Sequence, residues 1–186
     1  MKKKNIFQNI LILSLLILVV GRTSYAKYIN EIKFETFNIE FIAGDIELAL
    51  NDTNNEFVIV PGKVIEKDTK LTVKAGSEAC YVFVKLEKSN NFDSFIEYEV
   101  GNDWTELNEN SDIYYCELEK TIVDTDYNIF HNNEIIVKEN VEKEKYETDA
   151  QNNLTLSFTA YAVQKTSEIT SATEAWEFID SSDNLL

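Results

Sequence analysis

The sequence holds few of the side chains that enzyme chemistry needs. His131 is its single histidine and lies in an Asn-rich polar segment. A zinc hydrolase uses three protein ligands and a general base, and the chain has no HExxH or Cys-x-x-Cys motif. A Ser–His–Asp triad would have to use His131, and no nucleophile-elbow motif supports one. The five glycines are scattered, so they form no phosphate-binding loop. We therefore predict no catalytic residue, no cofactor and no catalytic metal.

Acidic residues suggest a second kind of chemistry, the binding of calcium. Segment 124–128 reads DTDYN, which is how a calcium-binding loop of the EF-hand type begins. The sixth position is Ile129 in place of glycine, and the twelfth is Ile135 in place of glutamate, so the EF-hand interpretation fails. A loosely held cation on clustered carboxylates stays an alternative to a solvated acidic surface.

The two cysteines, Cys80 and Cys116, both lie in segments with strand-like patterns. In an oxidising compartment such a pair favours one disulfide. Two free thiols in the core, behaving as small apolar residues, are the equal alternative. The sequence leaves both open.

The first 26 residues have the pattern of a secretory signal peptide. Three lysines at 2–4 precede an apolar run at 10–20, and Ser24-Tyr25-Ala26 ends in the small-x-small form that a signal peptidase cleaves. We predict cleavage between Ala26 and Lys27. The alternative is an uncleaved membrane anchor, but the run is shorter than the roughly 20 apolar residues that span a bilayer. We therefore expect a secreted protein that meets a signal peptidase during export and touches the membrane only through the uncleaved signal peptide.

The mature part, residues 27–186, is strongly acidic. The signal peptide contains four of the 17 basic residues and none of the 33 acidic ones, so the formal charge of the mature part is −20. Such a surface repels nucleic acid and keeps copies apart at low salt. It favours cations, basic partners, or self-association after the charge is screened or protonated. Its length, 160 residues, fits a single domain.

Alternation of apolar and polar residues predicts an all-β domain. The expected strands are 37–41, 46–50, 57–60, 71–73, 81–86, 96–100, 113–118, 135–137 and 154–163. Segment 81–86 is apolar on both faces except for Lys85, which indicates a central strand. Many short strands with Gly- and Asn-containing turns between them indicate an antiparallel β-sandwich.

Two stretches interrupt the β pattern. Segment 124–147 is mostly polar, and we interpret it as a long excursion from the sandwich, with a helix near 141–146. Segment 171–180 begins with the capping box Ser171-Ala172-Thr173-Glu174, which predicts a short C-terminal helix that packs Trp176 against the sheets.

The segment just after the cleavage site, residues 27–41, is strand-like and is freed by processing. The simpler interpretation is that it forms the first strand of its own sheet. It is also able to pair with the sheet edge of a neighbouring molecule, as in donor-strand complementation. Phe37, Ile39 and Phe41 are the strand-donor candidates, because they alternate and would fill an apolar groove.

Several segments resemble the TasA/camelysin family of secreted bacterial proteins, which a dedicated SipW-type signal peptidase processes. They are GRTSYAKY at 21–28, VPGK at 60–63, LTVK at 71–74, ACYVFVK at 79–85, LTLSFTAYAVQ at 154–164 and ATEAW at 172–176. The first has one residue added before Ala26 relative to the family's signal-peptide border. The resemblance covers most of the mature chain, and it implies a jelly-roll-like sandwich with a short C-terminal helix.

The resemblance also implies a function, which is a subunit of the cell surface or biofilm matrix. Such a subunit forms a homopolymeric fibre by donating its N-terminal strand, so the expected partner is a second copy of the chain. Some relatives carry a metalloprotease label, but no residue here matches a metal-ligand motif. A camelysin-type secreted metallopeptidase is one alternative function. A monomeric surface binding module, with segment 124–147 as its recognition loop, is the other.

Overall fold

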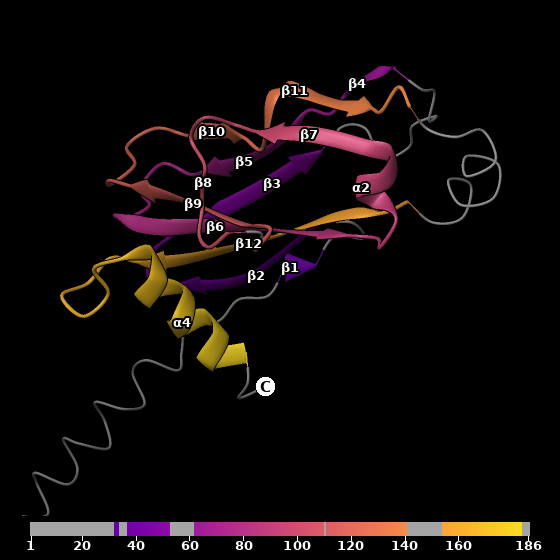
Figure 1. The fold of residues 1–186 in the computed structure, drawn as a ribbon. Helices are drawn as coiled ribbons and strands as arrows, with labels where there is room; N and C mark the ends of the chain where they lie inside the picture. Colours follow the sequence, from indigo (N-terminus) through magenta and orange to yellow (C-terminus); the bar gives the residue numbers. More distant parts are fainter. Residues whose placement is uncertain (1–31, 34–36, 53–61, 110, 141–153, 184–186) are drawn as a thin grey trace, which may run out of the picture.

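Paired β-strands form the body of the protein in this computed structural model, which describes residues 32–33, 37–52, 62–109, 111–140 and 154–183 (Figure 1). The strands are β1 (Ile32–Lys33), β2 (Phe37–Ala43), β3 (Leu48–Asp52), β4 (Val64–Glu66), β5 (Thr69–Val73), β6 (Cys80–Lys88), β7 (Ile96–Val100), β8 (Thr105–Glu106), β9 (Ile113–Leu118), β10 (Thr125–Asn128), β11 (Phe130–Val137) and β12 (Leu156–Gln164). The helices are α2 (Phe92–Phe95) and α4 (Ala172–Asp183). The prediction of a mostly β protein with a short C-terminal helix is confirmed. The signal peptide and the expected strand at 57–60 lie outside the described residues.

The first layer is a six-stranded sheet in the order β1-β2-β12-β6-β9-β8. Its pairs are antiparallel except that β2 runs parallel to β12. The predicted central strand is confirmed, because β6 lies between β12 and β9 and its first five residues are all buried. Both faces of this strand are covered, since the second layer packs on one face and α4 on the other. This explains its continuous apolar run.

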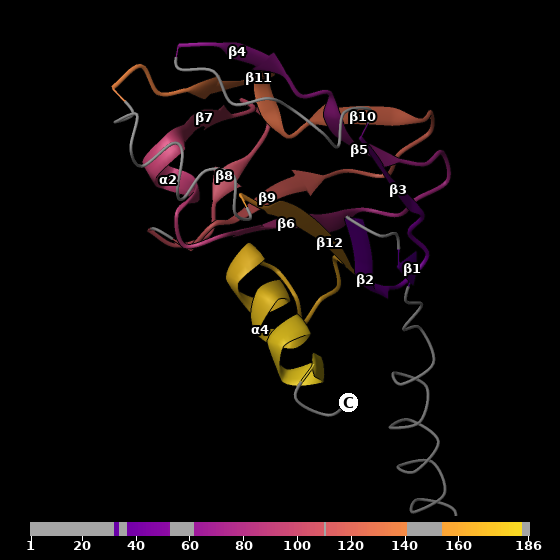
Figure 2. The same cartoon turned by 90° about the vertical axis from the view of Figure 1, so that its right-hand side faces the viewer.

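The second layer consists of two three-stranded sheets, β10-β5-β3 and β4-β11-β7. The two are joined along the chain, because β4 runs into β5 and β10 runs into β11. Hydrogen bonds continue the pairing across the junction: the Ile129 N–H donates to the Thr69 carbonyl (2.9 Å), and the Lys67 N–H donates to the Asn133 carbonyl (2.7 Å). The two three-stranded sheets therefore form one bent layer over the six-stranded sheet (Figure 2).

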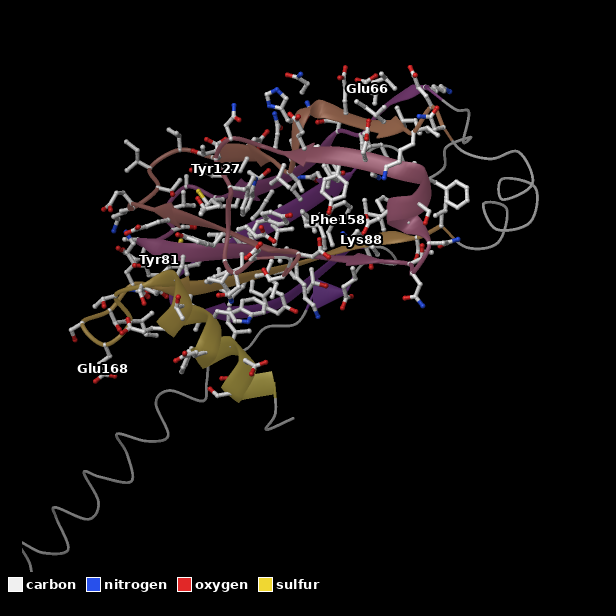
Figure 3. The ribbon with its side chains drawn as sticks, viewed as in Figure 1. Glu66, Tyr81, Lys88, Tyr127, Phe158 and Glu168 are labelled. Atoms are coloured by element: carbon white, nitrogen blue, oxygen red, sulfur yellow. The ribbon has the colours of Figure 1, made fainter. Side chains whose placement is uncertain are left out.

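Aromatic and aliphatic side chains from both layers form the main core. Phe158 of β12 lies between the layers (Figure 3) and packs edge-on against Phe130 of β11, with ring centroids 5.7 Å apart. Phe130 in turn contacts Tyr98 of β7 at 5.3 Å. Phe130 and Phe158 are fully buried, so these contacts hold the two layers together.

Helix α4 covers the outer face of the six-stranded sheet (Figure 2). Its predicted capping box is present: the Glu174 N–H donates to the Ser171 hydroxyl (3.2 Å), and the Ser171 N–H donates to the Glu174 carboxylate (3.0 Å). Trp176 packs on Phe83 and Tyr161, each at a centroid distance of 5.3 Å. The helix runs to Asp183, three residues beyond the expected end. The hydroxyls of its last turn bond to the Phe178 carbonyl and extend it.

The prediction of an excursion at 124–147 is wrong for residues 125–137, which form β10 and β11. The apolar residues of β11 that enter the core are Phe130, Ile135 and Val137, so the spacing is five and then two. A register shift between Phe130 and Ile135 causes this irregular spacing and hides the period of two. The helix expected near 141–146 lies outside the described residues.

Candidate functional site

The N-terminal strand β2 occupies an outer position of the six-stranded sheet. It pairs on one side with β12, from Phe37 opposite Phe158 to Ala43 opposite Val163. On its other side it pairs, within the described residues, with the two-residue strand β1. A strand in this position can leave the sheet by breaking its pairings with β12 and β1, while the pairings among the other strands stay intact. Its departure would expose the backbone edge of β12, which is an acceptor for another strand.

Strand β2 is held to the core by two isoleucines. Ile39 is 1% exposed and Ile42 is 9% exposed, and both belong to the main core. Ala160 and Tyr161 are adjacent in β12, but their partners in β2 are Ile39 and Phe41, so residue 40 is an extra residue and β2 contains a bulge. The bulge shifts the alternation, and the second core residue is therefore Ile42.

The bulge separates Phe41 from Phe37 and Ile39 in the backbone register with β12. Phe37 and Ile39 are in register with Phe158 and Ala160, which belong to the main core. Phe41 is in register with Tyr161, which belongs to the cluster beneath α4. A bulge of one residue leaves no mark in an alternating sequence, so the pattern could not reveal it.

The end of β2 is closely packed at Gly44. Its φ is +107°, a conformation that L side chains rarely adopt. A Cβ built at Gly44 would lie 2.6 Å from the Cβ of Gln164, at the end of β12. The Gln164 side chain also accepts a hydrogen bond from the Asp45 N–H at 3.3 Å. Gly44 is therefore the point at which the chain turns from the first layer toward β3 in the second.

The predicted cleavage site, Ala26 and Lys27, lies outside the described residues. The first described strand begins at Ile32, and the described part of the chain contains no helix long and apolar enough to cross a membrane.

The two cysteines lie side by side on β6 and β9 as buried free thiols. Cys80 is opposite Leu118, and Cys116 is opposite Val82, so the two residues are diagonal neighbours. Burial is the main cause that raises the pKa of Cys80 to about 12 and that of Cys116 to about 11. Thiols with such pKa values are protonated at neutral pH and are poor nucleophiles. In the structure both cysteines are free thiols on adjacent strands of the core.

The carboxylates of the calcium-like segment 124–128 bind neighbouring strands. Asp124 accepts hydrogen bonds from the Ala75 N–H and the Lys74 ammonium, each at 2.9 Å. These two contacts hold the pKa of the Asp124 carboxyl below its usual value. Asp126 accepts a hydrogen bond of 2.6 Å from the Thr72 hydroxyl. Within the described residues, no three His, Cys, Asp or Glu side chains are grouped as metal ligands.

A second surface feature was missed in the sequence, namely the outer face of β4-β11-β7. It carries Glu97 and Glu99 on β7, Glu134 and Ile136 on β11, and Val64 on β4. A hollow of about 430 Å³ lies on this face, lined by residues that include the three glutamates, His131 and Ile136. The alternation Ile-Glu-Tyr-Glu-Val at 96–100 already places both glutamates of β7 on one face, and this signal could have identified the site. We call this surface the acidic face.

Comparison with protein-family models, curated proteins and solved structures gave no match for this chain. Its function is therefore inferred from the two features above, the N-terminal strand and the acidic face.

Proposed function

We propose that the mature chain is a secreted structural subunit of the bacterial cell surface or biofilm matrix, with a jelly-roll-like β-sandwich fold. Each subunit donates its N-terminal strand to the next and so builds a homopolymeric fibre. The observation that supports this most is the position of β2. It is the first long strand of the described residues, it lies near the sheet edge, and it pairs along β12 in a position that an identical strand would fit.

The proposed exchange conserves the contacts that β2 makes in the monomer. A donated strand pairs its backbone with β12 of the acceptor, and its Ile39 and Ile42 enter the acceptor's core. Fully burying one isoleucine side chain contributes about 1.5–3 kcal/mol, so an empty groove is unfavourable and must be filled by one strand or the other. Gly44 is the natural hinge, because it lies where β2 ends and tolerates a positive φ.

Charge regulates this proposed assembly. The formal charge of −20 on residues 27–186 opposes close approach of two copies. Acid, salt and divalent cations reduce the repulsion, so each of them should promote fibre formation.

A crosslinking experiment tests the proposal directly. Asn38 of β2 and Thr159 of β12 are opposite each other in the register, so an Asn38→Cys/Thr159→Cys variant places two thiols on facing strands. If strands are exchanged, fibres grown at mildly acidic pH and then oxidised will give a ladder of covalent oligomers on a non-reducing gel. Each single-cysteine variant is the control and should give no ladder.

Two outcomes would contradict the proposal. Fibres in which the double variant forms only crosslinks within one chain would show that assembly uses another surface. Dispersed particles by electron microscopy in acid, in salt and with divalent cations would show that the chain does not polymerise, and would favour a monomeric surface binding module. Deleting residues 27–41 gives a second check, because it should abolish fibres that require strand donation.

A further inference from the structure

The acidic face presents a group of exposed glutamates. Glu97, Glu99 and Glu134 make no ion pair with any described residue, whereas lysines on the other sheets are paired with nearby carboxylates. Glu134 lies opposite Glu66 in the pairing of β11 with β4, so the acidic side chains of this face are close to one another in the sheet.

The same face exposes aliphatic side chains. Val64 is 49% exposed and Ile136 is 37% exposed, and the two are opposite each other in the register of β4 and β11. Glu97 of β7 is the neighbour of Ile136 on the other side. The row Glu97–Ile136–Val64 therefore crosses all three strands and combines a carboxylate with two apolar groups. Strand β7 is an end strand of this sheet within the described residues.

We propose that the acidic face docks a cationic polypeptide segment that carries lysine and aliphatic side chains. A lysine side chain fits the row because its methylene chain covers apolar surface while its ammonium group reaches a carboxylate. Its stem packs on Ile136 and Val64, and its ammonium group lies among Glu97, Glu99 and Glu134 in the hollow. Charge complementarity identifies the partner as a polycation, and the aliphatic pair distinguishes a polypeptide from a small inorganic cation. The proposal does not depend on polymerisation of the chain.

The test measures binding of a short synthetic peptide of alternating lysine and valine to residues 27–186 by titration calorimetry at low salt. The variant Glu97→Gln/Glu99→Gln/Glu134→Gln removes three charges from the face. Since an exposed ion pair is a weak interaction, losing three of them should weaken binding roughly threefold to 100-fold. Ile136→Ser should also weaken binding, because the lysine stem loses its apolar contact.

A matched control separates a local site from the general charge of the protein. Glu109→Gln/Glu168→Gln/Glu177→Gln removes the same charge from exposed positions elsewhere. Figure 3 shows Glu168 near α4, at the opposite end of the molecule from Glu66 on β4. Binding that falls by less than about twofold in the control, and by clearly more in the acidic-face variant, supports the docking site.

Two results would overturn the proposal. Equal losses in both triple variants would mean that the peptide senses only net charge. An equal affinity for a lysine and glycine peptide, with no effect of Ile136→Ser, would remove the aliphatic part of the site. Circular dichroism of each variant confirms that the fold is intact, since all substituted side chains are exposed or partly exposed.

Discussion

Replacing Ile39 by alanine tests whether the N-terminal strand is docked on its own subunit. The side chain is 1% exposed and lies in the main core, on a strand that is next to the end strand β1 of the described sheet. If β2 is docked as described, Ile39→Ala leaves a void between the layers. If the strand were detached in the monomer, the side chain would be solvated and its truncation would cost almost nothing.

The expected loss follows from the size of the truncated group. Removing three carbons from a buried isoleucine costs about 2.4 kcal/mol at about 0.8 kcal/mol for each. The cavity adds to this, so the unfolding free energy should fall by about 2–4 kcal/mol. For a domain of this size, 1 kcal/mol shifts the melting temperature by about 2–4 °C, which gives a decrease of about 4–16 °C.

The assay is urea unfolding of residues 27–186 at neutral pH, where copies repel each other. Ile136→Ala is the matched control, because it truncates the same residue type on a strand at a position that is 37% exposed. The control should lose about 1 kcal/mol or less, since its void opens to solvent. Equal small losses in both variants would refute the docked position of β2 and the mechanism of exchange built on it.

Three further predictions concern the hinge, the thiols and the helix cap. Gly44→Ala should destabilise the fold by about 1–3 kcal/mol in urea unfolding, and by more than Gly76→Ala, because both have positive φ but only the first would crowd Gln164. Burial raises the pKa of the Cys80 thiol to about 12, so a disulfide reagent at pH 8 should label neither thiol in the native protein and both in urea; rapid native labelling would contradict the burial. The pKa of Glu174 is held below its usual value, chiefly by a hydrogen bond from the backbone N–H that precedes the cap. Its contribution is therefore complete at neutral pH and is lost as the pH falls through the lowered folded-state pKa. The melting-temperature difference between wild type and Glu174→Ala should therefore shrink on acidification through that pKa. A difference that stays constant in acid would refute this.

Sequence patterns predicted best the elements in which the type of each residue matches its burial. In β6 the apolar run continues through residues on both faces, and only a central, doubly covered strand explains it. At α4 the capping box marks the first turn, and the spacing of Ala175 and Ile179 marks the buried side. These signals are local, so they do not depend on which elements lie nearby.

The elements that were missed depend on non-local pairing. Strand β10 is polar in three of its four residues, yet it forms because Thr125 to Asn128 pair with β5, more than fifty residues earlier in the chain. The bend at residues 131–134 uses Asn132 and Asn133 in left-handed conformations, with φ near 53° and 59°. Asparagine tolerates that conformation, but an Asn-rich sequence is equally typical of a loop. The acidic face was missed for a related reason, because its residues come from three strands whose order the sequence does not reveal.

The proposed exchange of β2 has an equilibrium and a rate that depend on different features of the structure. A docked strand and a donated strand make the same contacts with β12, so the balance between monomer and fibre depends on chain entropy, the hinge and repulsion between copies. The rate depends instead on undocking, since Ile39 and Ile42 must leave the core before a neighbour can supply its own strand. Ile39→Ala lowers the stability of both forms but also lowers this barrier. Under conditions where the wild type assembles slowly, the variant should therefore assemble with a shorter lag while forming less stable fibres. A longer lag would mean that undocking of β2 is not the step that limits assembly.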